Sequence, residues 1–139
     1  MIRNRSMPPG VFIPTLAYRS VPEAADWLCR VFGFQERLRI GDHRVQLVYG
    51  GASMVVTESA TDAVAVDMMH AVMVHVPDVD AHHARALQCG AKILGTPMDH
   101  PYGERQYAVE DIGGHRWVFT QSIADVDPAA WGGLLFDDA

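Results

Sequence analysis

The pattern of apolar and polar residues predicts the same series of elements twice along the chain. A buried strand and a short amphipathic helix are followed by three further strands, and the same order returns after a polar linker at 58–67. In the first copy, Ala24, Leu28, Val31 and Phe32 fall on one helical stripe, which should pack against a sheet. The elements expected there are strands at 11–18, 34–40, 44–49 and 53–57, and a helix between Ser20 and Gly33.

The second copy is expected to differ from the first mainly by a longer loop at 97–103. Its helix should begin after Asp78, a good N-cap, and end at Gly90. The residues expected on the inner stripe of this helix are Val79, His83, Ala86 and Leu87. The strands expected in this copy lie at 68–76, 92–96, 105–110 and 116–121. Pro97 should end the second of these strands, because proline cannot donate to a strand ladder.

The duplication is also visible in the residues themselves. The run Gly50-Gly-Ala-Ser-Met-Val-Val-Thr is echoed by Gly113-Gly-His-Arg-Trp-Val-Phe-Thr, each at the turn of a predicted hairpin. Two copies of one supersecondary unit in a short chain restrict the architecture strongly. Such duplications often form a ligand site between the copies, so a functional site is expected there.

The amino-acid composition argues against some classes of binding partner. The chain has 139 residues, a 49% hydrophobic share and a formal net charge of −6, which argues against nucleic acid and anionic membranes as partners. No apolar stretch approaches the roughly 18 residues of a membrane span, and no signal peptide follows Met1. The only basic run, at 3–5, falls in a leader that we expect to be disordered. Cys29 and Cys89 are expected to be reduced thiols, so the protein should be cytoplasmic.

A resemblance to a known family rests on the last predicted hairpin. The stretch Tyr102-Gly-Glu-Arg followed by Asp111-Ile-Gly-Gly-His-Arg-Trp resembles the "YG-x-R … D-P-x-G-H-x-W" signature of the vicinal oxygen chelate superfamily, with Ile112 where the family usually has proline. This superfamily contains glyoxalase I, bleomycin-resistance proteins and extradiol dioxygenases. Residues 76–91 match its usual helix unit, and the resemblance extends over about 11–122.

The resemblance implies an α+β fold in which two βαβββ units form a curled, mostly antiparallel sheet cup, with the helices on the convex side. We therefore expect a single domain over 1–139. Its first copy spans about 11–59, its second copy about 68–122, and residues 123–139 form a C-terminal tail.

The superfamily's metal site is predicted to be absent. Metal-dependent members carry ligands on the first and last strand of each unit, and these positions fall here at Ile13 or Pro14, Val55, Ala71 and Val118. Aliphatic side chains cannot ligate a divalent ion, so neither a metal nor another cofactor is expected. A shifted register would instead bring in His70 or His75.

The cup is the predicted site for a small organic ligand. Strand alternation places Met73, His75, Arg116 and Val118 on the concave face. Two readings of Arg105 stay open: a ligand anchor, or a partner of Glu104 and Glu110 in surface ion pairs. His75 is either a polar group of the cup or a structural histidine. The candidate ligand-binding residues are Tyr49, Met73, His75, Arg105, Tyr107, Arg116 and Val118, with Arg44 and Gln46 as further polar groups.

Three functions are compatible with this pattern. The first is a metal-free small-molecule binding protein of the glyoxalase and bleomycin-resistance type, forming a homodimer. The second is a divalent-metal-dependent lyase, isomerase or epimerase with an atypical ligand set, so whether the chain is an enzyme stays open. The third is a structural or subunit-interaction role, which a cup filled by its own side chains would support. The apolar tail at 131–136 is expected to dock, in a dimer on the partner.

Overall fold

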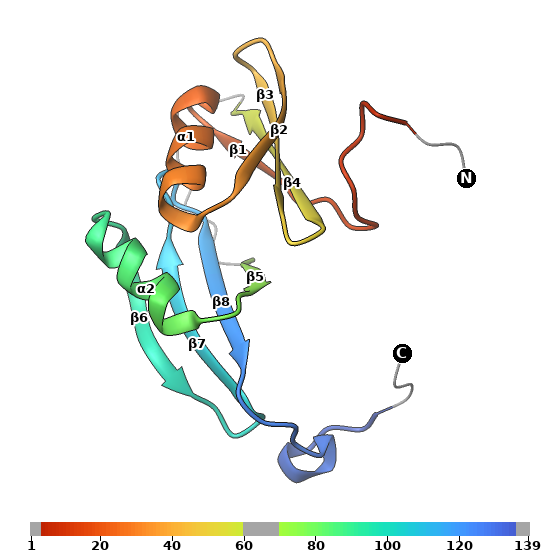
Figure 1. Ribbon diagram of the computed structural model, residues 1–139, viewed down its shortest axis with the longest axis vertical. Coiled ribbons are helices and arrows are strands. Elements are labelled where there is room, and N and C mark those ends of the chain that lie inside the picture. Colours follow the sequence, from red (N-terminus) through yellow and green to blue (C-terminus); the bar gives the residue numbers. More distant parts are fainter. Residues whose placement is uncertain (1–3, 60–69, 136–139) are drawn as a thin grey trace.

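The computed structural model describes residues 4–59 and 70–135. Two units with the same order of elements follow one another (Figure 1). The first unit contains β1 (Thr15–Tyr18), α1 (Val21–Phe32), β2 (Gln35–Ile40), β3 (Arg44–Tyr49) and β4 (Ala52–Glu58). The second contains β5 (Val72–His75), α2 (Val79–Gln88), β6 (Lys92–Asp99), β7 (Glu104–Glu110) and β8 (Arg116–Ser122). A short 3-10 helix, η1 (Pro128–Trp131), follows.

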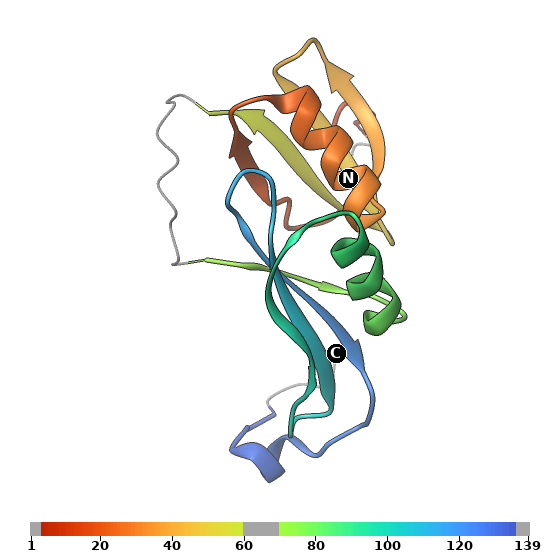
Figure 2. The same ribbon diagram turned by 90° about the vertical axis from the view of Figure 1, so that its left-hand side faces the viewer.

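Each unit forms one four-stranded sheet with the same topology. The strand order is β1-β4-β3-β2 in the first unit and β5-β8-β7-β6 in the second. The first strand of each unit pairs in parallel with the last, and the other pairs are antiparallel. The two sheets stay open, and α1 and α2 lie on the same side of them (Figures 1 and 2). The predicted α+β fold of two βαβββ units is therefore confirmed.

Local signals determine the ends of the helices. The side chain of Ser20 accepts from the backbone N–H of Glu23, and Gly33 ends α1 in the left-handed region, with φ of 82°. Asp78 caps α2 by accepting from the N–H of Ala81. These are the boundaries that the sequence predicts for both helices, except that the cap of α2 is Cys89, one residue before the expected Gly90.

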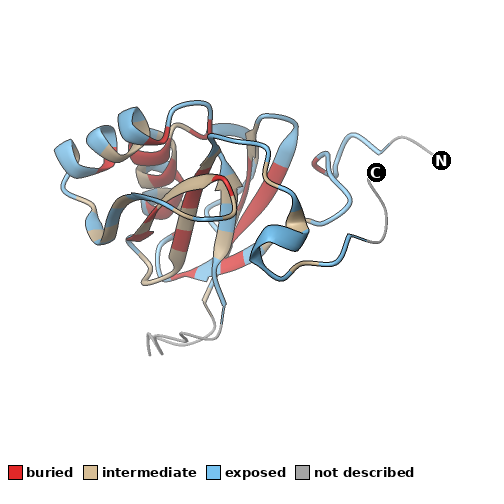
Figure 3. Cartoon of the chain, turned by 90° about the horizontal axis from the view of Figure 1, so that it is seen from below, coloured by how far each residue is buried: buried red, intermediate tan, exposed pale blue. Residues whose placement is uncertain are grey.

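One hydrophobic core runs through both units. Buried residues concentrate between the helices and the sheets, whereas the outer side of α2 is exposed (Figure 3). Phe32, at the end of α1, packs its ring against Trp117 and Phe119 of β8, with centroid distances of 5.5 and 4.8 Å. Because aromatic side chains bury large apolar areas, this contact joins the two copies at the centre of the core.

A buried carboxylate forms a second link between the copies. Asp111, in the β7–β8 turn, is 5% exposed and accepts four hydrogen bonds. Its Oδ1 accepts from the backbone N–H groups of Gly113 and His115, each at 2.9 Å. Its Oδ2 accepts from Trp117 Nε1 at 2.9 Å and from the hydroxyl of Tyr18 in the first copy. Burial, together with the charge of Asp111, raises the pKa of Tyr18, so the phenol stays protonated as a donor.

The turn that carries Asp111 fits closely against the first copy. A Cβ atom at Gly113 would lie 2.4 Å from Cδ2 of Tyr18, so only glycine can occupy this position. His115 Nε2 lies 2.8 Å from the carbonyl oxygen of Ala17, and its ring contacts that of Tyr18 edge-on. The signature residues of the last hairpin thus hold the end of β1.

His82 of α2, which the sequence did not place on the inner stripe of the helix, lies at the interface between the copies. Leu87 is 58% exposed, so its predicted position on the inner stripe is wrong. His82 instead lies 2.6 Å from the hydroxyl of Tyr107 and 3.0 Å from the carbonyl oxygen of Phe32. Because that carbonyl can only accept, Nε2 donates to it and Nδ1 accepts from Tyr107. Burial lowers the pKa of His82, so the neutral ring that this arrangement needs is favoured.

Two other predictions about local structure are wrong. Pro97 does not end β6, which continues to Asp99. As an edge strand with two register shifts around Gly95, β6 tolerates a residue without an N–H. The leader is not disordered from residue 4 onward, because it makes hydrogen bonds to β2 and β3. The rest of the predicted linker beyond Ser59, and the start of the strand expected at 68–76, lie outside the described residues.

Two further features bear on the environment of the protein. Cys29 and Cys89 are both free and partly buried. Within residues 4–59 and 70–135, no helix has the length and apolar character needed to cross a membrane.

Replacing Tyr18 with phenylalanine should destabilise the protein by about 1.5–3 kcal/mol, because a buried carboxylate loses a hydrogen-bond donor. Urea unfolding followed by circular dichroism measures the change. Tyr49→Phe is the matched control, since among the described residues the Tyr49 hydroxyl has no hydrogen bond. A free energy of unfolding for Tyr18→Phe within about 0.5 kcal/mol of the wild-type value would contradict the role given to this bond.

Candidate functional site

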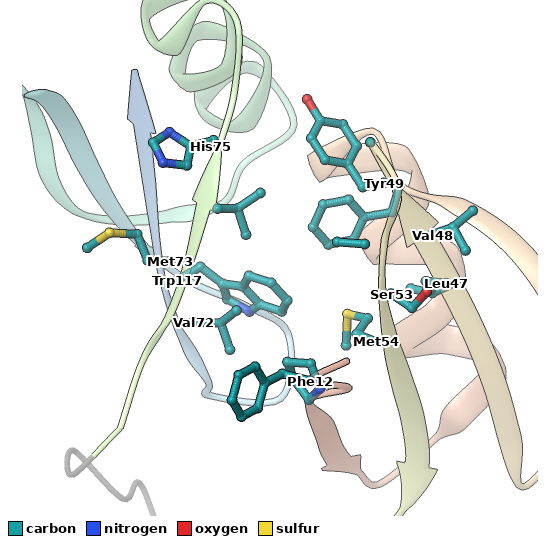
Figure 4. Close-up of a pocket in the computed structure, with 15 residues that line it drawn as sticks. Phe12, Leu47, Val48, Tyr49, Ser53, Met54, Val72, Met73, His75 and Trp117 are labelled. Carbon is teal, nitrogen blue, oxygen red and sulfur yellow. The ribbon is translucent and has the colours of Figure 1, made fainter. Parts of the chain in front are cut away.

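An apolar cavity lies between the two sheets. Its volume is about 380 Å³, and its walls come from both copies. The first copy contributes Phe34, Tyr49 and Met54, and the second contributes Val72, Val74 and Trp117. Figure 4 shows Tyr49 and Met54 facing Val72 and Trp117 across the gap. Phe12 lies at one end of the cavity, with most of its side chain exposed. A concave, mostly apolar site with few polar groups is the usual form of a small-molecule pocket.

The polar groups of this cavity are few. His75 and Tyr49 supply an imidazole and a phenol to the lining. Ser53 also lines the cavity, is 8% exposed, and its Oγ has no hydrogen-bond partner in the described part of the chain. A buried hydroxyl without a partner is unfavourable by about 1–3 kcal/mol. A ligand that supplied a hydrogen bond to Ser53 would remove this penalty.

The structure brings three of the predicted site residues to this cavity. Tyr49 lines it from the end of β3, and Met73 and His75 line it from β5. Met73 and His75 extend from the side of β5 that is turned away from the first copy (Figure 4). Met73 is 61% exposed, so it forms part of the rim of the cavity instead of the predicted floor.

Arg116 and Val118 do not line the cavity, but they share a face with Met73 and His75. We call this the open face: the side of each sheet turned away from its helix. Val118 is paired with Met73 across β5 and β8, whereas Trp117 and Phe119, which alternate with it, are buried in the core. The predicted alternation along β8 is therefore confirmed. Whether any of these residues contacts a ligand stays a prediction.

Arg105 and Tyr107 lie on the opposite side of the second sheet, so their predicted place in the cup is wrong. Arg105 forms ion pairs with Asp80 of α2 at 3.0 Å and with Asp99 of β6 at 2.9 Å. Tyr107 is 2% exposed and bonds to His82 in the core. The register after the Gly103 turn puts the odd-numbered residues of β7 on the helix side, and a one-residue difference in register exchanges the two faces. Arg105 is thus a surface ion-pair residue, with partners other than those expected.

The even-numbered residues of β7 form a polar network on the open face. Thr120 Oγ1 donates to Glu104 at 2.7 Å and accepts from Gln106 Nε2 at 3.1 Å, and the Tyr102 hydroxyl donates to Gln106 Oε1. Although burial works in the opposite direction, hydrogen bonds from Ser122 and Thr120 hold the pKa of Glu104 below its ordinary value. These polar groups form hydrogen bonds with one another, so few of their donors and acceptors remain available to a ligand.

The residues at the superfamily's metal positions do not fit a divalent ion. Val55 is 3% exposed, and Val118 and Ala71 supply no donor atom. His70 lies near His115, with ring centroids 6.1 Å apart. Across 4–59 and 70–135 no three histidine, cysteine, aspartate or glutamate side chains are grouped as metal ligands would be.

Sequence reasoning missed most of the apolar lining. Val72 and Val74 are expected to face the helix, and they do pack against the core, yet they also border the cavity. Trp117 has the same double role. These residues lie where the two sheets meet. Strand alternation predicts the face of the sheet on which a side chain lies, but it does not predict which edges of the two sheets are adjacent. The duplication was the signal that pointed to the boundary between the copies.

Known proteins share this fold and part of this sequence. TioX from Micromonospora sp. ML1 is 36% identical, with a TM-score of 0.69 over 85% of this chain and 100% of that chain. A glyoxalase/bleomycin resistance protein/dioxygenase from Nocardioides, at 14% identity, covers 94% of this chain and 91% of its own, with a TM-score of 0.67. The fosfomycin resistance protein FosX from Listeria monocytogenes, also 14% identical, covers 84% and 95%, with a TM-score of 0.66. The last two likenesses show the fold alone.

Relatives among curated proteins are uncharacterized. One from Mycobacterium bovis, Mb0911c, is 32% identical over 98 residues, which are 70% of this chain and 59% of that protein. Rv0887c from Mycobacterium tuberculosis matches equally, with 52% of its length covered. This chain thus spans little more than half the length of the curated relatives it matches. The sequence profile of one family matches residues 12–119, which include the first unit, the second unit as far as Phe119 in β8, and every residue that lines the cavity. The chain therefore belongs to the Glyoxalase/Bleomycin resistance protein/Dioxygenase superfamily.

Proposed function

We propose that this protein binds a small, largely apolar or aromatic organic molecule in the cavity between its two copies, without the superfamily metal. The observation that carries the proposal is the cavity itself, which is bordered by aromatic and aliphatic side chains from both sheets. The ring of Tyr49, which is only partly buried, offers a surface on which a planar ligand can pack. Ser53 and His75 would orient it by hydrogen bonds.

The ligand would extend from the cavity onto the open face of the second sheet. Met73 and His75 connect the two surfaces, because they line the cavity and share a face with Val118. Arg116 would then meet an anionic group at the end of the ligand. Sequestration of a metabolite or drug in the cytoplasm is the role that this geometry supports best. The alternative of a metal-dependent lyase or isomerase has no set of ligands among the described residues to favour it.

Filling the cavity should weaken binding of an aromatic anion. The probe is 1-anilinonaphthalene-8-sulfonate, whose fluorescence rises when it enters an apolar site. We expect Val72→Trp to weaken binding of this dye at least about tenfold, or 1.4 kcal/mol. Arg116→Ala should weaken it by about 1–3 kcal/mol if the sulfonate reaches the open face.

The matched control is Leu94→Trp, which adds the same side chain at a 42% exposed position of the edge strand β6. This variant should bind the dye like the wild-type protein, and EDTA should not change either affinity. Equal dye affinity in Val72→Trp and Leu94→Trp would contradict the proposed site. Loss of binding in EDTA would instead favour the metal-dependent alternative.

We also propose that the protein is a homodimer, as members of this superfamily commonly are. Val11, Phe12 and Leu134 are 96%, 90% and 77% exposed, and apolar side chains so exposed are typical of a contact surface. Within the described residues, the ring of Trp131 at the end of η1 contacts that of Tyr102, whereas Leu134 and Leu135 beyond it are 77% and 59% exposed. A partner subunit would cover these residues.

Light scattering at micromolar concentration should therefore give about twice the chain mass of 15.3 kDa. Leu134→Asp should raise the dissociation constant of the dimer at least about tenfold, because it buries a charge at the contact. Leu94→Asp, with the same change on β6, is the control. A wild-type mass of a single chain at this concentration would overturn the dimer.

A further inference from the structure

The open face of the first sheet is covered by the N-terminal segment of the same chain. Val45 and Leu47 of β3 lie in the core below α1, so Gln46, between them, belongs to the open face. Gln46 is nevertheless only 3% exposed. Residues 4–10 lie on the side of this sheet away from α1 (Figure 1), and Pro8 among them is buried. The first open face is therefore occupied, whereas that of the second sheet leaves Met73 and His75 exposed.

Two side chains of the sheet hold this segment by its main chain. Gln46 Nε2 donates to the carbonyl oxygen of Ser6 at 2.8 Å. Arg37 Nη2 donates to the carbonyl oxygen of Arg5 at 2.9 Å. Arg37 Nη1 also donates to Gln46 Oε1 at 2.7 Å, which fixes the amide so that its nitrogen faces the segment. The two donors thus form one hydrogen-bonded pair that contacts the carbonyls of two successive residues.

The segment also has a local conformation suited to this contact. The side-chain oxygen of Asn4 accepts from the backbone N–H of Ser6 at 3.1 Å, and the backbone carbonyl of Asn4 accepts from the N–H of Met7, also at 3.1 Å. This turn directs the carbonyls of Arg5 and Ser6 toward the sheet. The side chain of Met7 is 54% exposed, so side chains contribute little apart from Pro8. A pair of donors that contacts only carbonyl oxygens recognises a peptide main chain irrespective of its sequence.

We propose that the open face of the first sheet is a binding site for a peptide main chain, and that residues 4–8 of the same chain are its resident occupant. The Ser6 carbonyl pairs with the Gln46 amide, so the segment covers this side chain without leaving a buried N–H unsatisfied. A peptide or peptide-like compound with two successive amide carbonyls is the class of molecule that can replace the segment. This site is separate from the cavity between the copies and does not depend on the function proposed for it.

Replacement would also change the wall of the cavity. Phe12 and Pro14 continue directly from the segment and line the cavity, and the carbonyl of Pro14 accepts from the N–H of Val55 in β4. A molecule that displaces residues 4–8 frees the chain up to this anchor, and with it Phe12. Occupation of the open face and of the cavity would then be linked through the same few residues.

The full-length chain offers a direct test by competition. Pro8→Asp should expel the segment, because it places a charge at a buried position, whereas Pro9→Asp makes the same change at an exposed one. The probe is a fluorescein-labelled peptide with the sequence of residues 4–9, measured by polarization. An intramolecular occupant acts at an effective concentration in the millimolar range. We therefore expect Pro8→Asp to bind the peptide at least about tenfold more tightly than the wild-type or Pro9→Asp chain.

Two additions test the recognition itself. A peptide with alanine at the positions of Arg5 and Ser6 should bind Pro8→Asp within about threefold of the original, since only carbonyls are contacted. Adding Arg37→Ala to Pro8→Asp should abolish binding, while adding Arg39→Ala, an arginine of the same strand that pairs with Glu36, should not. Equal peptide affinity in the wild-type, Pro8→Asp and Pro9→Asp chains would overturn the proposal. If the wild-type chain excludes the peptide at high protein concentration but binds it after dilution, the occupant comes from another chain. That result would overturn the intramolecular assignment.

Limited proteolysis provides a second measurement if Pro8→Asp does not fold. Trypsin cleaves after Arg5, at a peptide group whose carbonyl is bound by Arg37. We expect this cleavage, followed by mass spectrometry of the native protein, to be at least about tenfold faster in Arg37→Ala than in the wild-type chain. Arg39→Ala should be cleaved at the wild-type rate. Equal rates in all three chains would show that the segment is not held by this pair.

Discussion

The buried carboxylate of Asp111 is the interaction on which the arrangement of the two copies depends. It accepts two N–H groups of its own turn, the indole of Trp117 and the hydroxyl of Tyr18 from the other copy. A buried carboxylate is tolerated only when its oxygens are fully bonded, so the turn, β8 and the end of β1 must be in place together. The lack of space for a Cβ at Gly113 adds a steric requirement to this electrostatic one.

The cavity is a consequence of this linkage. With the ends of β1 and β8 joined and Phe32 packed on β8, the sheets meet at an angle that leaves apolar side chains facing one another without filling the space between them. Neither copy alone supplies both walls of the cavity. The same frame leaves the two open faces unequal: the first is covered by the chain's own leader, and the second carries a polar network around Thr120 that is satisfied internally. The apolar cavity thus lies between the copies, not on either open face.

Much of the fold could be predicted because its signals are local. Ser20, Gly33 and Asp78 mark helix ends by their own backbone chemistry, and the repeated order of elements follows from the hydrophobic pattern. The site was harder to predict from the sequence, because it depends on how elements far apart in the chain pack together. The faces of Arg105 and Tyr107 depend on the register after Gly103, which no residue pattern specified. The place of His82 depends on a carbonyl 50 residues away, and the leader is ordered by partners on β2 and β3.

Native-state hydrogen exchange tests most directly whether the two copies form one cooperative unit. Val56 in β4 and Phe119 in β8 lie in interior strands of the two sheets and are fully buried. If the linkage through Asp111 and Phe32 governs the fold, the amides of both residues exchange only through global unfolding. Their free energies of opening should then be equal and should fall by the same amount in Tyr18→Phe. Opening energies that differ by more than about 1 kcal/mol would show that the copies unfold separately, and would contradict this account.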